Sequence, residues 1–267
     1  MLAAQAVYWQ ARYVDQELKS RRVAITGPQN CDTSDLLTSM KTLAAIEPES
    51  LRIEWVTTGP QHLITDFNTP VDPPACVIFV VSAVEGDGDI DDATTRAWEA
   101  CAERNVPRII VISHSEDPDA DFEDAVTHCQ AALDEAASIV AVQLPLYADG
   151  AGVGGILDLL TESIYDYSVA TGSGAYGRYL VIPAEPEHLS LITDDRDRLL
   201  EGIATESADP HFIEKLISGH HFDTEVVQRE FIDSVRGGLL YPVVFHASYP
   251  SGFGTDPLLQ LLRDCLS

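Results

Sequence analysis

The sequence predicts an α/β fold of three layers, in which a mostly parallel sheet carries helices on both faces. Two observations indicate this class. Short apolar runs alternate with segments whose apolar residues recur at helical spacing, as in repeated strand–helix units. The runs at 77–81 and 109–112 are continuously apolar, which is typical of parallel strands that are buried on both faces. Consecutive helical segments at about 178–238 interrupt the alternation and are expected to form a helical insert.

The strands are expected at short runs rich in Val and Ile, bounded by turn-forming residues. In chain order they are Val23–Thr26, Ile53–Val56, Val77–Val81, Ile109–Ile112, Ile139–Gln143 and Val243–Phe245. Helices are expected between these strands and at the end of the chain, at 36–46, 61–67, 91–104, 121–137 and 256–266.

The insert is expected to hold four helices in a separate lobe at the edge of the sheet. They are predicted at 185–192, 194–205, 210–217 and 224–236. The stretch 165–177, which is rich in Gly, Ser and Tyr, is expected to be a loop. Residues 1–20 are predicted to form an N-terminal helix that precedes a single domain over 21–267.

The composition is strongly acidic, with a formal net charge of −27 over 267 residues. Such a surface repels phosphate backbones and anionic lipids, so direct binding to nucleic acid or to a membrane is not expected. The five cysteines form no C-x-x-C pair and predict neither a disulfide framework nor a zinc site. The N-terminal segment has the pattern of neither a signal peptide nor a membrane span, so a cytoplasmic protein is expected.

Residues 22–37 have the layout of a nucleotide phosphate loop, in which an apolar strand leads through a glycine into a helix. In the pattern G-x-x-x-x-G-K-[ST], Gly27 fills the first position, and Ser34 fills the last, where a hydroxyl holds magnesium. Asp32 stands at the second glycine and Thr33 at the lysine. The layout predicts a P-loop NTPase-type fold, but a carboxylate has entered the loop and the phosphate-binding cation is missing.

A run of acidic residues at 87–92 has the composition of a calcium-binding loop. The bidentate glutamate at the twelfth position of such a loop is missing, so a calcium site is not predicted.

Four groups of residues occur in the order found in one family of translation factors. They are 79–86 with 98, 106–108 and 120–122; 143–146 with 155–160; 201–206 with 214–216, 219 and 224–232; and 241–244 with 248, 252–254 and 258–259. On these residues the chain resembles the GTP-binding (G) domain of elongation factor G, and more closely that of actinobacterial elongation factor G-like proteins. The resemblance covers nearly all of residues 20–267. The family's downstream domains have no counterpart here, so the chain alone is not expected to carry out translocation.

The resemblance implies a guanine-nucleotide site whose magnesium and γ-phosphate elements are degenerate. The family's D-x-x-G element falls on 57–60, so Thr57 replaces the aspartate that holds a magnesium-bound water. Pro60 replaces the glycine whose N–H contacts the γ-phosphate, and proline has no N–H. Gln61 falls where the family has the histidine that orients the attacking water. Thr57 follows Gly27 by only 30 residues, too few for the family's first switch.

The base-reading elements are degenerate as well. The family's N-K-x-D element falls on 113–116, where Ser113 and His114 replace the amide and the lysine and Glu116 replaces the aspartate. Of the family's last element, G-S-A, only Ser248 is retained.

These losses predict a pseudo-GTPase that acts as a scaffold or binding module. No cofactor is expected, and if one binds the resemblance implies GTP or GDP with magnesium. The expected partner is a protein, with the ribosome as a candidate place of action. Two alternatives stay open: a GTP-binding elongation factor-like protein with residual GTPase activity, and a truncated product without a selected role.

Overall fold

A computed structural model describes residues 21–29, 31, 33–46, 53–67, 73–84, 86, 89–133, 138–148, 152–168, 179–207, 209–219, 222–247 and 252–266. The predicted N-terminal helix over 1–20 lies outside these residues, as do Asp32, Ser248 and residues 169–177 of the expected loop.

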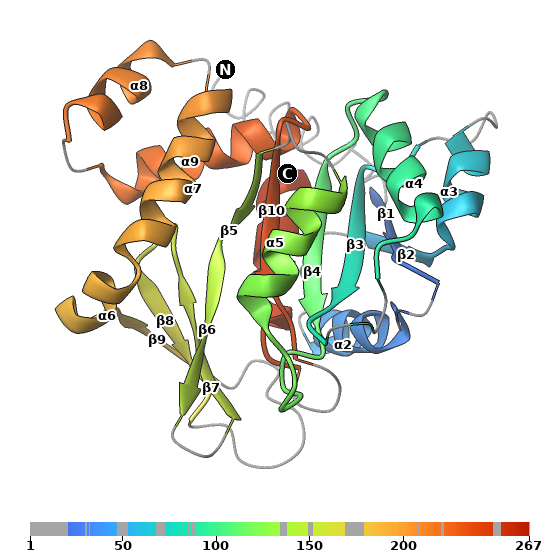
Figure 1. The fold of residues 1–267 in the computed structure, drawn as a ribbon, viewed down its shortest axis with the longest axis horizontal. Coiled ribbons are helices and arrows are strands. Elements are labelled where there is room, and N and C mark those ends of the chain that lie inside the picture. The colour runs from blue at the N-terminus through green and yellow to red at the C-terminus, as the bar shows by residue number, and fades with distance from the viewer. Residues whose placement is uncertain are drawn as a thin grey trace, which may run out of the picture.

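The centre of the fold is a six-stranded sheet in which every pair of neighbours is parallel (Figure 1). Its strands are β1 (Arg21–Thr26), β2 (Ile53–Thr57), β3 (Cys76–Ser82), β4 (Arg108–Ser113), β5 (Ser138–Ala141) and β10 (Leu240–Phe245). The spatial order is β2–β1–β3–β4–β10–β5. Every residue of β3, β4 and β10 is buried, as their apolar runs predict.

Helices cover both faces of this sheet, which confirms the predicted three-layer α/β class. The first face carries α2 (Thr33–Ile46), α7 (Thr193–Glu206), α9 (Thr224–Arg236) and α10 (Thr255–Leu266). The second carries α3 (Pro60–Phe67), α4 (Asp92–Ala102) and α5 (Phe122–Leu133). Because side chains alternate along a strand, Val80 packs in the first layer and its neighbour Phe79 in the second.

A second sheet, which the sequence pattern did not predict, is antiparallel. It contains β6 (Gln143–Ala148), β7 (Gly152–Asp158), β8 (Ser163–Asp166) and β9 (Leu180–Pro183) in that order. The prediction of one strand over Ile139–Gln143 is wrong, because β5 ends at Ala141 and Gln143 opens the other sheet. No Gly, Pro, Asn or Asp stands between Ala141 and Gln143, so the sequence carries no turn signal at this change of partner.

Two further predictions are corrected at the second sheet. The expected loop over 165–177 begins too early, because Tyr165 and Asp166 belong to β8 and pair with β7 and β9. The range of about 178–238 is not wholly helical, because β9 occupies its first part.

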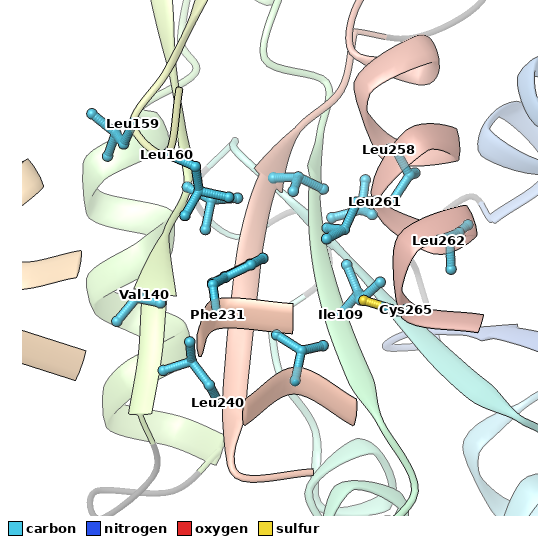
Figure 2. Packing of buried hydrophobic residues seen from close by; sticks show 14 of the residues in the cluster. Ile109, Val140, Leu159, Leu160, Phe231, Leu240, Leu258, Leu261, Leu262 and Cys265 are labelled. Carbon is cyan, nitrogen blue, oxygen red and sulfur yellow. The ribbon is translucent and has the colours of Figure 1, made fainter. Parts of the chain in front are cut away.

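The four predicted helices of the insert are present, but they do not form a separate lobe. They are α6 (Pro186–Leu191), α7, α8 (Pro210–Ile217) and α9. The apolar face of α9 carries Val227, Phe231 and Val235 at a spacing of four residues, and all three are fully buried. Figure 2 shows Phe231 in one cluster with Ile109 of β4 and Leu240 of β10. The insert therefore contributes to the core of the sheet.

Candidate functional site

A cleft of about 500 Å³ lies between the loop after β1 and the segment after β2. We call it the β1–β2 cleft. Strand β1 pairs in parallel with β2, so the segments that follow these two strands leave the sheet at the same edge. Such crevices outside the carboxyl ends of parallel strands are where open α/β sheets bind ligands. The lining residues that the structure describes are Gly27, Pro28, Gln29, Cys31, Thr33, Thr57, Thr58, Gly59, Pro60, Gln61, His62, Asp91 and Ala93.

The cleft brings together five of the residues singled out from the sequence: Gly27, Thr33, Thr57, Pro60 and Gln61. These residues come from two segments that the sequence analysis assigned separately to phosphate and magnesium binding. Their meeting at one edge of the sheet follows from the parallel pairing of β1 with β2.

The other predicted site residues lie elsewhere. Ser34 is an exposed residue in the first turn of α2 and does not line the cleft. Ser113 is the last residue of β4, and His114 and Glu116 follow it; β4 is separated from β1 by β3. Asp32 and Ser248 belong to the positions that the structure does not describe.

Gly27 is required by the packing of the backbone, whatever the cleft binds. A Cβ atom at this position would lie 2.4 Å from the carbonyl oxygen of Val80 in β3. A contact that short would force the loop and β3 apart. Close packing against β3 therefore requires glycine at the first position of the motif, whether or not a phosphate binds.

Several backbone N–H groups around the cleft are absent or already paired. Pro28 and Pro60 have none. The N–H of Cys31 donates to the Pro28 carbonyl at 3.0 Å, and that of Thr58 donates to the Ile25 carbonyl at 3.0 Å. These positions consequently provide little of the curled array of N–H groups with which a phosphate loop holds an anion.

The loop after β1 also contacts a carboxylate of its own chain, that of Asp91. This residue is the N-cap of α4, and its side chain accepts hydrogen bonds from the Thr94 N–H at 2.7 Å and the Thr94 hydroxyl at 2.8 Å. Its second oxygen accepts from the backbone N–H of Gln29 at 3.4 Å. Partial burial tends to raise the pKa of Asp91, but the hydrogen bonds from Thr94 and Gln29 outweigh it and lower the pKa below its usual value. The group is therefore an anion at neutral pH.

Sequence reasoning missed Asp91 as a cleft residue. Its position before a helix, with Thr94 three residues later, is a signal for an N-cap. That local signal cannot reveal the contact with Gln29, which lies 62 residues away.

Sequence comparison links this fold to one family of translation factors. No family model matches the chain. An elongation factor G-like protein of Mycobacterium tuberculosis is 28% identical over 82% of this chain. An elongation factor G of Ureaplasma parvum is 26% identical over 86% of it. The chain is similar to elongation factor G-like proteins over most of its length.

A solved structure agrees with this relationship at the level of the fold. A crystal structure of a Thermus thermophilus protein matches 93% of the chain with a TM-score of 0.67 and 20% sequence identity. The matched regions are only parts of these proteins. The chain spans 28% of the length of the Mycobacterium tuberculosis relative, 31% of the Ureaplasma parvum protein and 40% of the Thermus thermophilus chain. The resemblance to an elongation factor G-like G domain is thus confirmed.

In this elongation factor G-like chain, the segment at the predicted base-reading position is a tight turn after β4. The Ser113 side chain is buried, and its hydroxyl donates to the Val81 carbonyl at 3.3 Å. His114 has a φ of 57°, in the left-handed region, and its carbonyl accepts from the Asp117 N–H at 3.1 Å. Glu116 is exposed on this turn. The Ser113 hydroxyl therefore bonds to the neighbouring strand β3. Of the three predicted base-reading residues, Glu116 is the exposed one.

The described residues contain neither a metal-binding cluster nor a membrane span. No three His, Cys, Asp or Glu side chains in this part of the chain gather as a metal site. Within the acidic run, Asp91 caps α4. None of the helices described here is long and apolar enough to cross a membrane.

Proposed function

We propose that this elongation factor G-like chain is a pseudo-GTPase whose G-domain fold serves as a binding module. The observation that carries the proposal is the hydrogen bond from Gln29 to the Asp91 carboxylate, since an internal anion contacts the loop that would hold a nucleotide phosphate. The residues present do not fit a magnesium-bound triphosphate. Paired N–H groups, two prolines and a carboxylate line the cleft, and its described lining residues include no Lys or Arg.

Repulsion between the Asp91 carboxylate and a bound phosphate would be large enough to weaken nucleotide binding measurably. Two like charges about 4 Å apart repel by about 1 kcal/mol in water and about 4 kcal/mol at an effective dielectric constant near 20. A lysine in the family's loop would provide attraction of similar size, and Thr33 stands in its place. Catalysis of phosphoryl transfer depends on positioning and charge stabilisation, so the loss affects both binding and turnover.

The direct test is single-turnover GTP hydrolysis by the purified chain, with and without magnesium and with and without ribosomes. We expect no magnesium-dependent turnover above the buffer rate. Ser34→Ala removes the hydroxyl at the family's magnesium position, and Ser190→Ala, an exposed hydroxyl in α6, is the matched control. Turnover that Ser34→Ala abolishes and Ser190→Ala leaves intact would restore the alternative, an elongation factor-like protein with residual GTPase activity.

We also propose where the chain acts and what kind of partner it binds. We expect the chain to act in the cytoplasm, with a protein as its partner and the ribosome as the candidate place of action; its similarity to elongation factor G-like proteins supports this expectation. Its net charge of −27 favours a basic protein surface over RNA, whose phosphates it would repel. A gel shift that showed tight, salt-sensitive binding to ribosomal RNA would contradict this part of the proposal.

A further inference from the structure

We propose that the β1–β2 cleft binds a basic side chain, arginine or lysine, of a protein partner. The inference rests on the proposed function, because a cleft that holds magnesium and GTP would not be open to such a side chain. Beyond the proposed function, it names the ligand, a cationic side chain, and the residue that recognises it, Asp91.

The side chains that line the cleft suit a positively charged ligand. Asp91 is the one carboxylate among the described lining residues, and none of these is Lys or Arg. The other polar side chains of the lining are the hydroxyls of Thr33, Thr57 and Thr58 and the amides of Gln29 and Gln61, which accept hydrogen bonds as well as donate them, and the imidazole of His62. The hydroxyls and amides can serve a cation or an anion, so Asp91 decides the charge: its carboxylate only accepts hydrogen bonds, and a guanidinium or ammonium group only donates them.

The second argument is the preorganisation of Asp91. Thr94 holds one carboxylate oxygen through two hydrogen bonds, and the Gln29 N–H holds the other. A side chain fixed in this way loses little rotational freedom when a ligand binds. Hydrogen bonds from a cationic donor to a carboxylate are also about twice as strong as those between neutral groups.

The third argument is space and long-range charge. The volume of about 500 Å³ falls within the range of about 300–1,000 Å³ that is usual for ligand pockets, and it accommodates one long side chain. The net charge of −27 attracts a basic partner before contact and raises its rate of association. The cleft volume and the net charge therefore both favour binding of a basic side chain, as the lining does.

The test is a titration followed through the backbone amide signals of Gly27, Thr58 and Gly59. The probe is a blocked Gly-Arg-Gly peptide, and its reference is the same peptide with citrulline, which has nearly the same shape and no charge. We expect the arginine peptide to bind at least fivefold more tightly than the citrulline peptide. In Asp91→Asn this preference should disappear, because the charge is lost while asparagine still caps α4.

The control variant is Asp209→Asn. Asp209 is the N-cap of α8, accepts from the His211 N–H at 3.0 Å and lies across the molecule from α3 and α4 (Figure 1). The substitution removes the same charge from an equivalent position, so it should leave the preference for arginine unchanged. Equal binding of the two peptides by the wild-type chain, or an unchanged preference in Asp91→Asn, would overturn the inference. Binding of spermine without binding of the arginine peptide would overturn it as well, by assigning the cleft to a small polyamine.

Failure of this inference can be told apart from failure of the proposed function by adding magnesium and GTP to the same titration. If GTP shifts the three amide signals and displaces the peptide, the pseudo-GTPase proposal fails. If neither GTP nor the peptide shifts them, the inference alone fails.

Discussion

The backbone N–H of Gln29 donates to the carboxylate of Asp91 across 3.4 Å and so joins the loop after β1 to the start of α4. In a nucleotide-binding loop, N–H groups at this edge of the sheet point at a phosphate. Here one of them points at an aspartate of the same chain. The phosphate-loop motif, to which Gln29 belongs, is thus bonded to the carboxylate that lines the cleft.

Asp91→Ala should lower the free energy of unfolding by about 1 kcal/mol, because it removes an N-cap, whereas Asp91→Asn should cost less. It should also free the Gln29 amide for hydrogen exchange. Urea unfolding and amide exchange measure the two effects. Asp209→Ala, which removes the α8 cap, should lower stability similarly without changing the exchange of Gln29. Equal exchange at Gln29 in both variants would show that the contact with Asp91 does not protect this amide.

Restoring the phosphate-loop motif should not restore catalysis. The double variant Asp32→Gly with Thr33→Lys returns the second glycine and the lysine, but Thr57 and Pro60 still line the cleft and Asp91 still contacts its loop. Single-turnover hydrolysis by this variant should stay at the buffer rate, even if nucleotide affinity rises. Magnesium-dependent turnover would contradict this prediction, because it would mean that Thr57, Pro60 and Asp91 do not prevent hydrolysis.

The helical insert should unfold together with the sheet. Phe231→Ala in α9 removes a fully buried ring from the common core and should cost about 3–5 kcal/mol. Ile217→Ala in α8, where the side chain is 82% exposed, should change stability by less than about 0.5 kcal/mol. Urea unfolding of Phe231→Ala, followed by tryptophan fluorescence and by circular dichroism, should show one coincident transition. Two separate transitions would support the independent lobe that the sequence predicted.

Stability should decrease in mild acid because of His246. This residue is fully buried after β10, neither ring nitrogen has a hydrogen-bond partner among the described residues, and burial, with His114 nearby, lowers its pKa from 6.5 to about 3. Between these values the unfolded chain binds the proton that the folded chain excludes. Stability from this group is therefore complete above pH 6.5 and falls by up to about 1.4 kcal/mol per pH unit below it. His246→Leu should flatten the dependence measured by urea unfolding from pH 7 to 4.5, and an unchanged slope would contradict this account.

Tyr241→Phe should destabilise the chain by about 1–3 kcal/mol, because a buried polar contact is lost. The Tyr241 hydroxyl accepts from the Arg108 guanidinium at 2.6 Å and donates to the Gly238 carbonyl at 2.8 Å. Arg108 also stacks over the rings of Tyr241 and Trp98, at 4.0 and 4.5 Å from their centroids. Tyr147→Phe, at a side chain that is 59% exposed, is the control and should change stability by less than about 0.5 kcal/mol. Equal urea midpoints for the two variants would contradict the prediction.

By itself, the sequence determined the parallel strands β1–β4 and β10, the four insert helices and the degenerate phosphate-loop layout. These features are local: a buried parallel strand is a continuous apolar run, and a helix shows its period within a few turns. Gly27, Thr33, Thr57, Pro60 and Gln61 were therefore found from sequence spacing and family resemblance before any geometry was known.

Only the tertiary structure decided which sheet each part of residues 138–148 joins, that α9 packs in the common core, and that Asp91 contacts the loop after β1. In the first case the two sides of Val142 take different partners: β5 pairs with β10, which is far away in sequence, and β6 pairs with β7, the next strand along the chain. The Val142 N–H donates to the Val243 carbonyl at 3.0 Å. In the last, a capping aspartate has the same local sequence whether or not a distant N–H faces it. Contacts between distant segments are set by how the elements pack, and no local period records them.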